Sequence, residues 1–342
     1  MATIDDVAKV VGVSPSTVSR ALSRPDMVSR ATRERIVDAA QQLGYPVDSP
    51  RAPRPRSAQM IALLIPDLLH PFYTTIARGV QDVAEQYEHQ VLFYNTAADV
   101  ERENRMLEQA LQQKAQGLLL VPSTPDLSHL AALDLPVIEI DRFSGTPGVN
   151  SVVAENVRGV VMALEHLIGL GHRRIGIIGG VPESSSTREK LEGYRQAMAH
   201  AQLAVDPSWV RFSQSQEEGG KQATLELLAL PTALRPTALF ACDSETAAGM
   251  VRAVRGQGLA VPQELSLIGF DDSRWAQIMD PPLTVVDQPA YEMGRVACDL
   301  LFQQLQRDFR LPALQIRLAT QLVVRHSTAP PPSASGAKRT TR

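Results

Sequence analysis

Short apolar runs alternate with helical segments from residue 60 onward, and this alternation constrains the fold more than any other feature of the chain. The first run, MIALLIP at 60–66, is apolar at almost every position, as expected of a strand buried on both faces. A helix over 71–88 follows, with Phe72, Ile76 and Val80 on one face. Repeated βα units of this kind predict parallel sheets that are covered by helices on both faces.

The βα units fall into two series, which predict an α/β fold with two similar lobes over residues 60–326. The first series has strands at 60–66, 91–95, 117–122 and 136–141 and helices at 71–88 and 101–114. The second has helices at 155–170, 189–201, 218–230, 244–257 and 291–306 and strands at 174–180, 209–212, 238–243, 265–272 and 284–288.

The segment Thr3–Leu22 has a different pattern, in which two short helices flank a glycine. Gly12 can leave a helix with positive φ, and Ser14 followed by Pro15 is typical of the start of the next helix. Such a pair is typical of a helix-turn-helix, whose second helix enters the DNA major groove. A surface helical hairpin is the alternative, but the position ahead of a much larger domain favours DNA binding. The apolar residues of the first helix are Ile4, Val7, Ala8 and Val11.

The N-terminal region also has a net positive charge and a proline-rich segment. The first 59 residues carry nine Lys and Arg against six Asp and Glu, whereas the whole chain has a net charge of −3. A third helix over 30–43 completes a predicted DNA-binding domain at 1–45. Residues 46–59 then predict a linker, because four prolines alternate there with arginines that include Arg51 and Arg54. The linker is either a plain tether or one whose arginines reach phosphates or the minor groove.

Several classes of protein are not expected from the composition. Cys242 and Cys298 cannot build a disulfide framework, and no Cys/His spacing indicates a metal site. The chain begins with no signal-peptide pattern and has no apolar run that could span a bilayer, so we expect a cytoplasmic protein. Residues 327–342 are rich in Pro and Ser and predict a disordered tail.

Polar residues follow the ends of most predicted strands. Ligands of open α/β sheets bind beyond the carboxyl ends of the strands. Carboxylates accept hydrogen bonds from vicinal hydroxyls, arginine and amide groups donate to them, and aromatic faces cover the apolar side of a sugar ring. An Asp at a strand end often caps the next helix instead, but the recurrence favours a polyol pocket. The candidates are Phe72, Tyr73, Pro122, Asp141, Arg142, Arg188, Asp243, Asp271 and Gln288.

A series of motifs also runs through the chain in a fixed order. DVAKVVGVSPSTVSRAL, VSRATRERI and LGY lie in the N-terminal domain, and IPDLLHPFY, GLLLVP, EIDR, GHRRIGIIGG, REKLEGYRQAM and VPQELSLIGFDD lie in the larger one. With these motifs the chain resembles the LacI/GalR family of transcription regulators from Thr3 to about His326, and it looks most similar to the ribose-type repressors. The resemblance implies a periplasmic-binding-protein-like fold for the larger domain.

The resemblance also implies roles for particular residues. Pro15, Ser16 and Arg20 would read operator bases, and Arg20 bound to a guanine would contribute about 1–3 kcal/mol of discrimination. The predicted DNA-contacting set also includes Thr3, Ser14, Thr17, Ser19, Arg51 and Arg54. The effector residues of ribose-binding relatives match Phe72, Tyr73, Asp141, Arg142, Arg188, Asp271 and Gln288.

Three features depart from the family pattern, and one of them is the absence of an aromatic residue that relatives often have near Ser215. SPRAPRPR stands where relatives usually have a hinge helix with a leucine that wedges into the minor groove. Asp243-Ser244 replaces a common Asn-Asp, which changes one carboxamide ligand into a carboxylate.

These observations predict a homodimeric repressor that binds a pseudo-palindromic operator and responds to a small sugar-like effector between its lobes. The alternatives are control by a partner protein or by a phosphorylated or acidic sugar, and a transport-type sugar-binding protein. We expect neither an enzyme nor a cofactor, because Gly176, Gly179 and Gly180 do not form GxGxxG and neither GKS/T nor GxSxG occurs.

Overall fold

The chain divides into two compact units, residues 1–58 and 59–342. The structure is a computed structural model, and it describes residues 3–23, 28–45, 59–127, 130, 133–306 and 313–332. Residues 46–58 of the predicted linker, including Arg51 and Arg54, lie outside the described residues. Residues 333–342 of the predicted tail also lie outside them.

The first unit contains three short helices, α1 (Ile4–Val11), α2 (Pro15–Ser23) and α3 (Arg30–Gln42). Gly12 ends α1 with a φ of 74°, as the sequence predicts. Val7, Val18 and Ile36, one from each helix, are fully buried and meet in a common core. The three helices therefore form the predicted helix-turn-helix domain.

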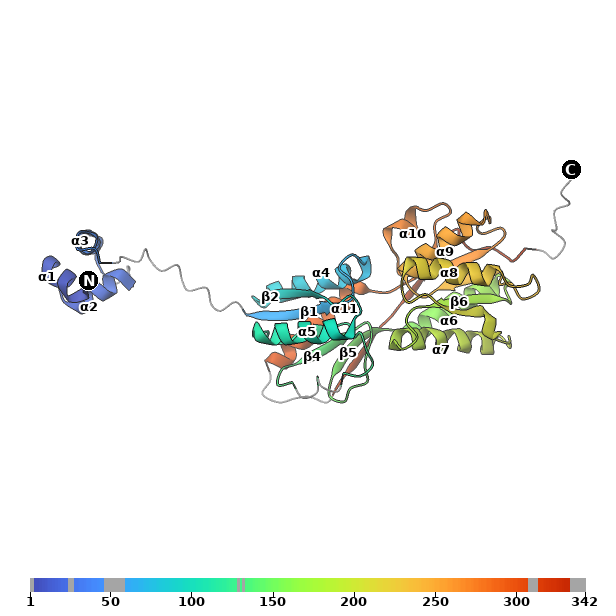
Figure 1. Cartoon of the computed structure of the whole chain (residues 1–342), viewed down its shortest axis with the longest axis horizontal. Coiled ribbons are helices and arrows are strands. Elements are labelled where there is room, and N and C mark those ends of the chain that lie inside the picture. Colours follow the sequence, from blue (N-terminus) through green and yellow to red (C-terminus); the bar gives the residue numbers. More distant parts are fainter. Residues whose placement is uncertain are drawn as a thin grey trace. The chain divides into compact units, whose positions relative to one another are not determined.

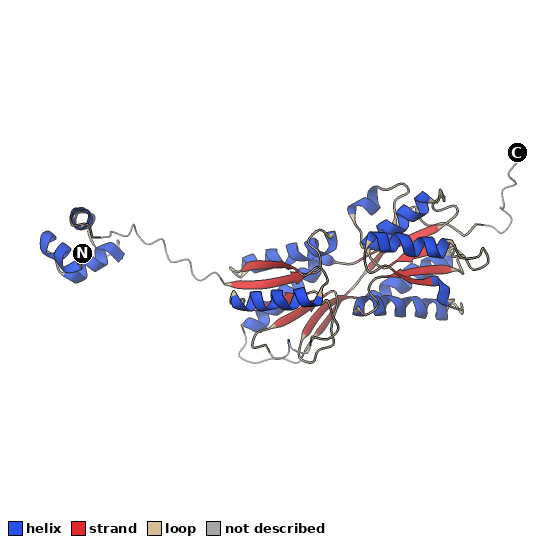
Figure 2. Ribbon diagram, viewed as in Figure 1, coloured by secondary structure: helices blue, strands red, loops and turns tan. Residues whose placement is uncertain are grey.

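The second unit has two lobes, each built on a six-stranded sheet (Figures 1 and 2). The first sheet has the order β11-β5-β4-β3-β1-β2 and is parallel throughout. Its strands are β1 (Met60–Ile65), β2 (Gln90–Asn95), β3 (Leu118–Leu120), β4 (Val137–Ile140), β5 (Asn150–Ala154) and β11 (Gln315–Leu318). Helices α4 (Pro71–Gln86), α5 (Val100–Gln112) and α11 (Ala290–Leu305) pack on it.

The second sheet repeats this topology with the order β12-β10-β9-β8-β6-β7, and only β12 runs antiparallel to its neighbour. Its strands are β6 (Ile175–Gly179), β7 (Val210–Phe212), β8 (Ala238–Ala241), β9 (Ser266–Phe270), β10 (Thr284–Asp287) and β12 (Gln321–Val323). The helices of this lobe are α6 (Asn156–Gly169), α7 (Ser185–His200), η3 (Pro207–Trp209), α8 (Glu217–Leu228), α9 (Ser244–Gly256) and α10 (Arg274–Ile278). The two similar α/β lobes that the sequence predicts are present.

Helix α11 is one place where the prediction was wrong. The sequence placed this helix at the end of the second series, but its buried residues Met293, Leu301 and Phe302 belong to the core of the first lobe. The helix packs against α4, β3, β4 and β5, and Figure 1 shows it within the first lobe. The chain passes between the lobes after β5, after β10 and after β11. Helical periodicity identifies α11 correctly but contains no information about which sheet it covers.

The prediction of a disordered tail is also wrong for its first residues, 327–332. Ser327 is fully buried, and its hydroxyl donates to the carbonyl of Leu267 at 2.6 Å. The carbonyl of Ala329 lies 2.9 Å from Nε2 of His172, which is also buried. These contacts attach the segment to the second lobe, although its Pro/Ser composition resembles that of unfolded chains.

Candidate functional site

The first lobe contributes one side of the candidate site from the segment between β1 and α4. His70 caps α4, because its Nδ1 accepts a hydrogen bond from the backbone N–H of Phe72 at 3.3 Å. Phe72 and Tyr73 follow in the first turn and are buried. The His70 and Tyr73 rings lie 5.0 Å apart. The cap therefore orients an aromatic cluster at the carboxyl end of β1, next to Asp67.

Asp141 and Arg142 add a charged group from the end of β4. Nη2 of Arg142 donates to the hydroxyl of Tyr73 at 2.9 Å, and its Nε lies 3.5 Å from a carboxylate oxygen of Asp141. Asp141 has a φ of 66°, a left-handed backbone conformation that turns the chain sharply after the strand. Burial raises the pKa of Tyr73, so its hydroxyl stays protonated.

The second lobe has an equivalent position at the end of β9. Asp271 has a φ of 70°, and its N–H donates to the carbonyl of Val286 in the next strand, as the N–H of Asp141 does to that of Val152. Its carboxylate accepts a hydrogen bond from Nε2 of Gln288 at 2.6 Å. Burial raises the pKa of Asp271 to about 6, although the nearby Lys190 ammonium and the bond from Gln288 oppose the shift.

Lys190 is the buried cation of this lobe. Its Nζ donates to the carbonyl of Cys242 at 2.9 Å and lies 3.8 Å from the centre of the Phe270 ring. Burial raises the pKa of the Cys242 thiol to about 12, which makes it unreactive at neutral pH. Asp243 caps α9 through one oxygen, which accepts from the N–H of Thr246 at 2.8 Å. Asp243 is therefore a strand-end Asp that caps the next helix, the role that the sequence offered as the alternative to a ligand contact.

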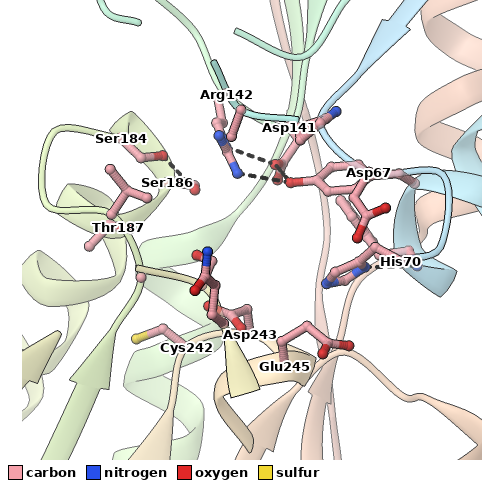
Figure 3. Close-up of a pocket in the computed structure, with 18 of the residues that line it drawn as sticks. Asp67, His70, Asp141, Arg142, Ser184, Ser186, Thr187, Cys242, Asp243 and Glu245 are labelled. Atoms are coloured by element: carbon pink, nitrogen blue, oxygen red, sulfur yellow. Dashed lines mark hydrogen bonds and ion pairs between the residues drawn. The ribbon is translucent and has the colours of Figure 1, made fainter. Parts of the chain in front are cut away.

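These residues surround a cavity of about 460 Å³ between the two lobes (Figure 3). Direct contacts also cross between the lobes beside it, from Ser244 to His70 at 3.3 Å and from the N–H of Phe143 to Ser185 at 2.8 Å. Seven of the nine predicted effector residues line the cavity, namely Phe72, Tyr73, Asp141, Arg142, Asp243, Asp271 and Gln288.

The other two predicted effector residues do not line it. Pro122 lines a smaller neighbouring hollow, and its carbonyl accepts from Arg142 at 3.4 Å. Arg188 is exposed and donates to the carbonyl of Glu183. The prediction of Arg188 therefore finds no support in the geometry, and Lys190 occupies the expected place of the second-lobe cation.

Sequence reasoning omitted several cavity residues from the candidate set. Thr187 was missed because α7 begins at Ser185, four residues before the predicted start, whereas Lys190 lay inside the predicted helix but was not recognised as buried. Thr187 and Lys190 are three residues apart and therefore lie on the same face of α7. The buried Tyr194, one turn further along, shows that this face is buried. The other omitted polar residues are Asp67, His70, Asn95, Ser184, Ser186, Gln214, Ser215, Gln216, Glu217 and Glu245.

The candidate DNA-contacting surface lies on α2. Its buried residues Val18 and Ala21 face the core of the domain, whereas Pro15, Ser16, Ser19 and Arg20 are exposed. The exposed side of α2 can therefore present these four residues to a partner.

Hydroxyl groups cap the starts of α1 and α2. The Ser14 hydroxyl accepts from the N–H of Thr17 at 3.2 Å and lies 2.8 Å from the hydroxyls of Ser16 and Thr17. Thr3 forms a capping box with Asp6 at the start of α1. Thr3 and Ser14 thus hold helix termini in addition to any contact with DNA.

Parts of both units match known protein families. Residues 3–47 match the family described as bacterial regulatory proteins, lacI family, and residues 164–328 match a periplasmic binding protein-like domain. The HTH-type transcriptional repressor CytR of Escherichia coli (strain K12) is 36% identical over 89% of this chain and 90% of its own length. The chain belongs to the lacI family of bacterial regulatory proteins.

Further comparisons agree with this lacI-family assignment. The ribose operon repressor of Haemophilus influenzae is 31% identical over 90% of this chain and 92% of its own length. The structure of the transcriptional regulator CelR–cellobiose complex matches with a TM-score of 0.72 at 29% identity, over 96% of this chain and 100% of that one. The chain is thus a DNA-binding transcriptional regulator, and the repressors among its relatives agree with the expectation that it is not an enzyme.

The described residues contain neither a membrane-spanning helix nor a metal-binding cluster. No helix in the described ranges is long and apolar enough to cross a membrane. No group of three or more His, Cys, Asp or Glu in the same ranges is placed to hold a metal ion.

Proposed function

We propose that this lacI-family regulator is a repressor whose affinity for operator DNA is controlled by a small sugar-like effector in the cavity between its lobes. The observation that supports this most is the set of buried and half-buried polar groups there. Arg142 and Lys190 are donors, Asp271 is an acceptor, and Gln288 supplies both kinds of group. A compound with several hydroxyls satisfies such a mixture, and Phe72 and Tyr73 offer apolar cover.

The proposal explains how an effector can act on DNA binding. The cavity has walls from both lobes, so a ligand that contacts Arg142 on one side and Asp271 on the other favours the arrangement that brings them together. The population can shift only by as much as the affinities for the two arrangements differ. In a homodimer, such a shift changes the spacing of two DNA-binding domains on the half-sites of a palindrome.

We assign the DNA contacts to α2 and to the arginines that follow the domain. Arg20 is the longest polar side chain on the exposed side of α2 and reaches a base edge, while Pro15, Ser16 and Ser19 lie against the groove. Thr3, Ser14 and Thr17 lie at helix starts, where N–H groups and hydroxyls contact phosphates. Arg51 and Arg54 add phosphate or minor-groove contacts. A chain that acts on the operators of a bacterium works in the cytoplasm.

A two-stage binding experiment tests the function. The full chain first selects duplexes from a randomised pool, and we expect recovery of a pseudo-palindrome bound by a dimer. A panel of pentoses, hexoses, sugar acids and sugar phosphates is then added to the complex, and at least one is expected to change the operator affinity tenfold or more. If operator binding responds to none of them while a cell extract contains a protein that changes it, control by a partner protein replaces the proposal.

A further inference from the structure

The cavity contains more negative than positive groups. Six carboxylates line it, those of Asp67, Asp141, Glu217, Asp243, Glu245 and Asp271, against one arginine and one lysine. Arg142 is paired with Asp141, the charge of Lys190 acts on Asp271, and Glu217 is paired with Arg252 outside the cavity. Within the described residues, Asp67, Asp243 and Glu245 have no ion pair.

These three carboxylates surround the same opening from both lobes. Figure 3 shows Asp67 beside His70 on the first-lobe side and Asp243 with Glu245 on the second-lobe side. Burial raises the pKa of Glu245, the nearby His70 ring opposes this shift, and the neighbouring charges of Asp243, Glu217 and Asp67 act in the same direction as burial. Like charges held this close repel one another, and a ligand with a positive charge would relieve that repulsion.

Both ring nitrogens of His70 are engaged in hydrogen bonds in this arrangement. Its Nδ1 accepts a hydrogen bond from the N–H of Phe72, which requires an unprotonated nitrogen. In the neutral ring the proton is then on Nε2, which lies 3.3 Å from the Ser244 hydroxyl. The imidazole therefore acts as a helix cap and a bridge between the lobes.

A second observation points to a ligand rich in hydrogen-bond donors. Gln288 is only 6% exposed and lines the cavity, and its Oε1 has no hydrogen-bond partner within the described residues. Its amide nitrogen is fixed on Asp271, so the oxygen cannot exchange places with the nitrogen without losing that bond. An unsatisfied buried acceptor costs free energy, which a donor on a bound ligand recovers.

We propose that the effector is a polyhydroxylated compound bearing a protonated amine, of the amino-sugar or amino-polyol class. The amine lies among Asp67, Asp243 and Glu245, and a hydroxyl donates to Oε1 of Gln288. This inference rests on the proposed function and narrows its ligand. A phosphate or carboxylate at the same place would face three unpaired anions, so acidic and phosphorylated sugars are excluded from the site.

Calorimetry with matched sets of sugars tests the charge preference. The full chain at pH 7 and low salt is titrated with glucosamine, glucose and glucose 6-phosphate, with galactosamine, galactose and galacturonate, and with glucamine and sorbitol. In at least one set we expect the amine to bind tenfold or more tightly than its neutral parent and the anion to bind more weakly. The advantage of the amine decreases with added salt, because it is electrostatic.

The outcomes separate this inference from the proposed function. If neutral or anionic members bind as tightly as the amines in every set, the amine proposal fails and the sugar-effector function stands. If no member of any set binds, the sugar-effector function fails, and this inference fails with it.

A pair of variants locates the amine. In the Asp243→Asn, Glu245→Gln double variant, the ratio of amine to neutral affinity falls tenfold or more. The cap of α9 survives in this variant, because the side-chain oxygen of asparagine accepts the same hydrogen bond. Glu218→Gln, an exposed carboxylate that does not line the cavity, leaves the ratio unchanged. Without any ligand, the double variant has a higher Tm at low salt than the parent chain, because repulsion is removed. An unchanged ratio, or a lower Tm, overturns the assignment.

Discussion

Gln288 donates a hydrogen bond from its side-chain amide to the carboxylate of Asp271 over 2.6 Å, and the two residues follow the neighbouring strands β10 and β9. The bond fixes the direction of the Gln288 amide, which lines the cavity. It also keeps Asp271 available as an acceptor, while burial raises the pKa of this carboxyl to about 6.

The first prediction concerns Asp271 and the pH dependence of stability. Because its pKa in the folded chain lies above the ordinary value of 3.8, the folded state binds this proton more tightly than the unfolded state. The contribution favours folding below about pH 4 and is lost as the pH rises to about 6. It amounts to roughly 2–3 kcal/mol at most. In Asp271→Asn this part of the pH profile disappears, which urea unfolding at pH 4 to 7.5 measures. A variant profile parallel to that of the parent chain contradicts the prediction.

The second prediction contrasts Lys190 with Arg188 on the same helix. Lys190→Met leaves the buried carbonyl of Cys242 without its donor and removes the positive charge that acts most strongly on Asp271. We expect a loss of about 1–3 kcal/mol of unfolding free energy. Arg188→Met changes an exposed side chain, and its effect stays within about 0.5 kcal/mol. Urea unfolding at pH 7 compares the two.

The same pair of variants distinguishes their roles in binding. A sugar that binds the parent chain loses tenfold or more in affinity with Lys190→Met and is unaffected by Arg188→Met. A loss with Arg188→Met would restore the interpretation made from the sequence.

The third prediction concerns the packing of α11 on α4. A Cβ at Gly294 would collide with the carbonyl of Ile76, and one at Gly79 would collide with that of Tyr291. Gly294→Ala therefore forces the helices apart and costs about 1–3 kcal/mol. Gly169→Ala is the control, because it lies in α6 with no atom within 4 Å of the new Cβ, and it gains about 0.5 kcal/mol. Equal stability of the two variants would contradict the close packing.

The sequence predicted most of the elements because their signals are local. Gly12 and Ser14 mark the turn between α1 and α2 by their own backbone and capping preferences. Asp141 and Asp271 were placed in the site because both end buried strands of parallel sheets, and such ends lie on one edge.

What the sequence did not predict depends on long-range packing. Periodicity cannot show that α11 returns to the first lobe. Lys190 was overlooked because a lysine in a predicted helix is normally exposed, and its burial depends on long-range contacts with Cys242 and Phe270. The acidic balance of the cavity also emerges only in three dimensions, because Asp67 and Glu245 come from different lobes.

The final prediction concerns Arg20. This side chain is exposed on α2, so Arg20→Ala leaves the Tm of the chain within about 1 °C, since exposed substitutions have small effects. If Arg20 reads a guanine, the variant loses about 1–3 kcal/mol of discrimination between the selected operator and a duplex with that base pair changed. Arg30→Ala is the control, because Arg30 is 93% exposed on α3 and pairs only with Glu34 within the described residues. Gel-shift titrations with both duplexes measure the ratio, and full discrimination by Arg20→Ala would assign base reading to another residue of α2.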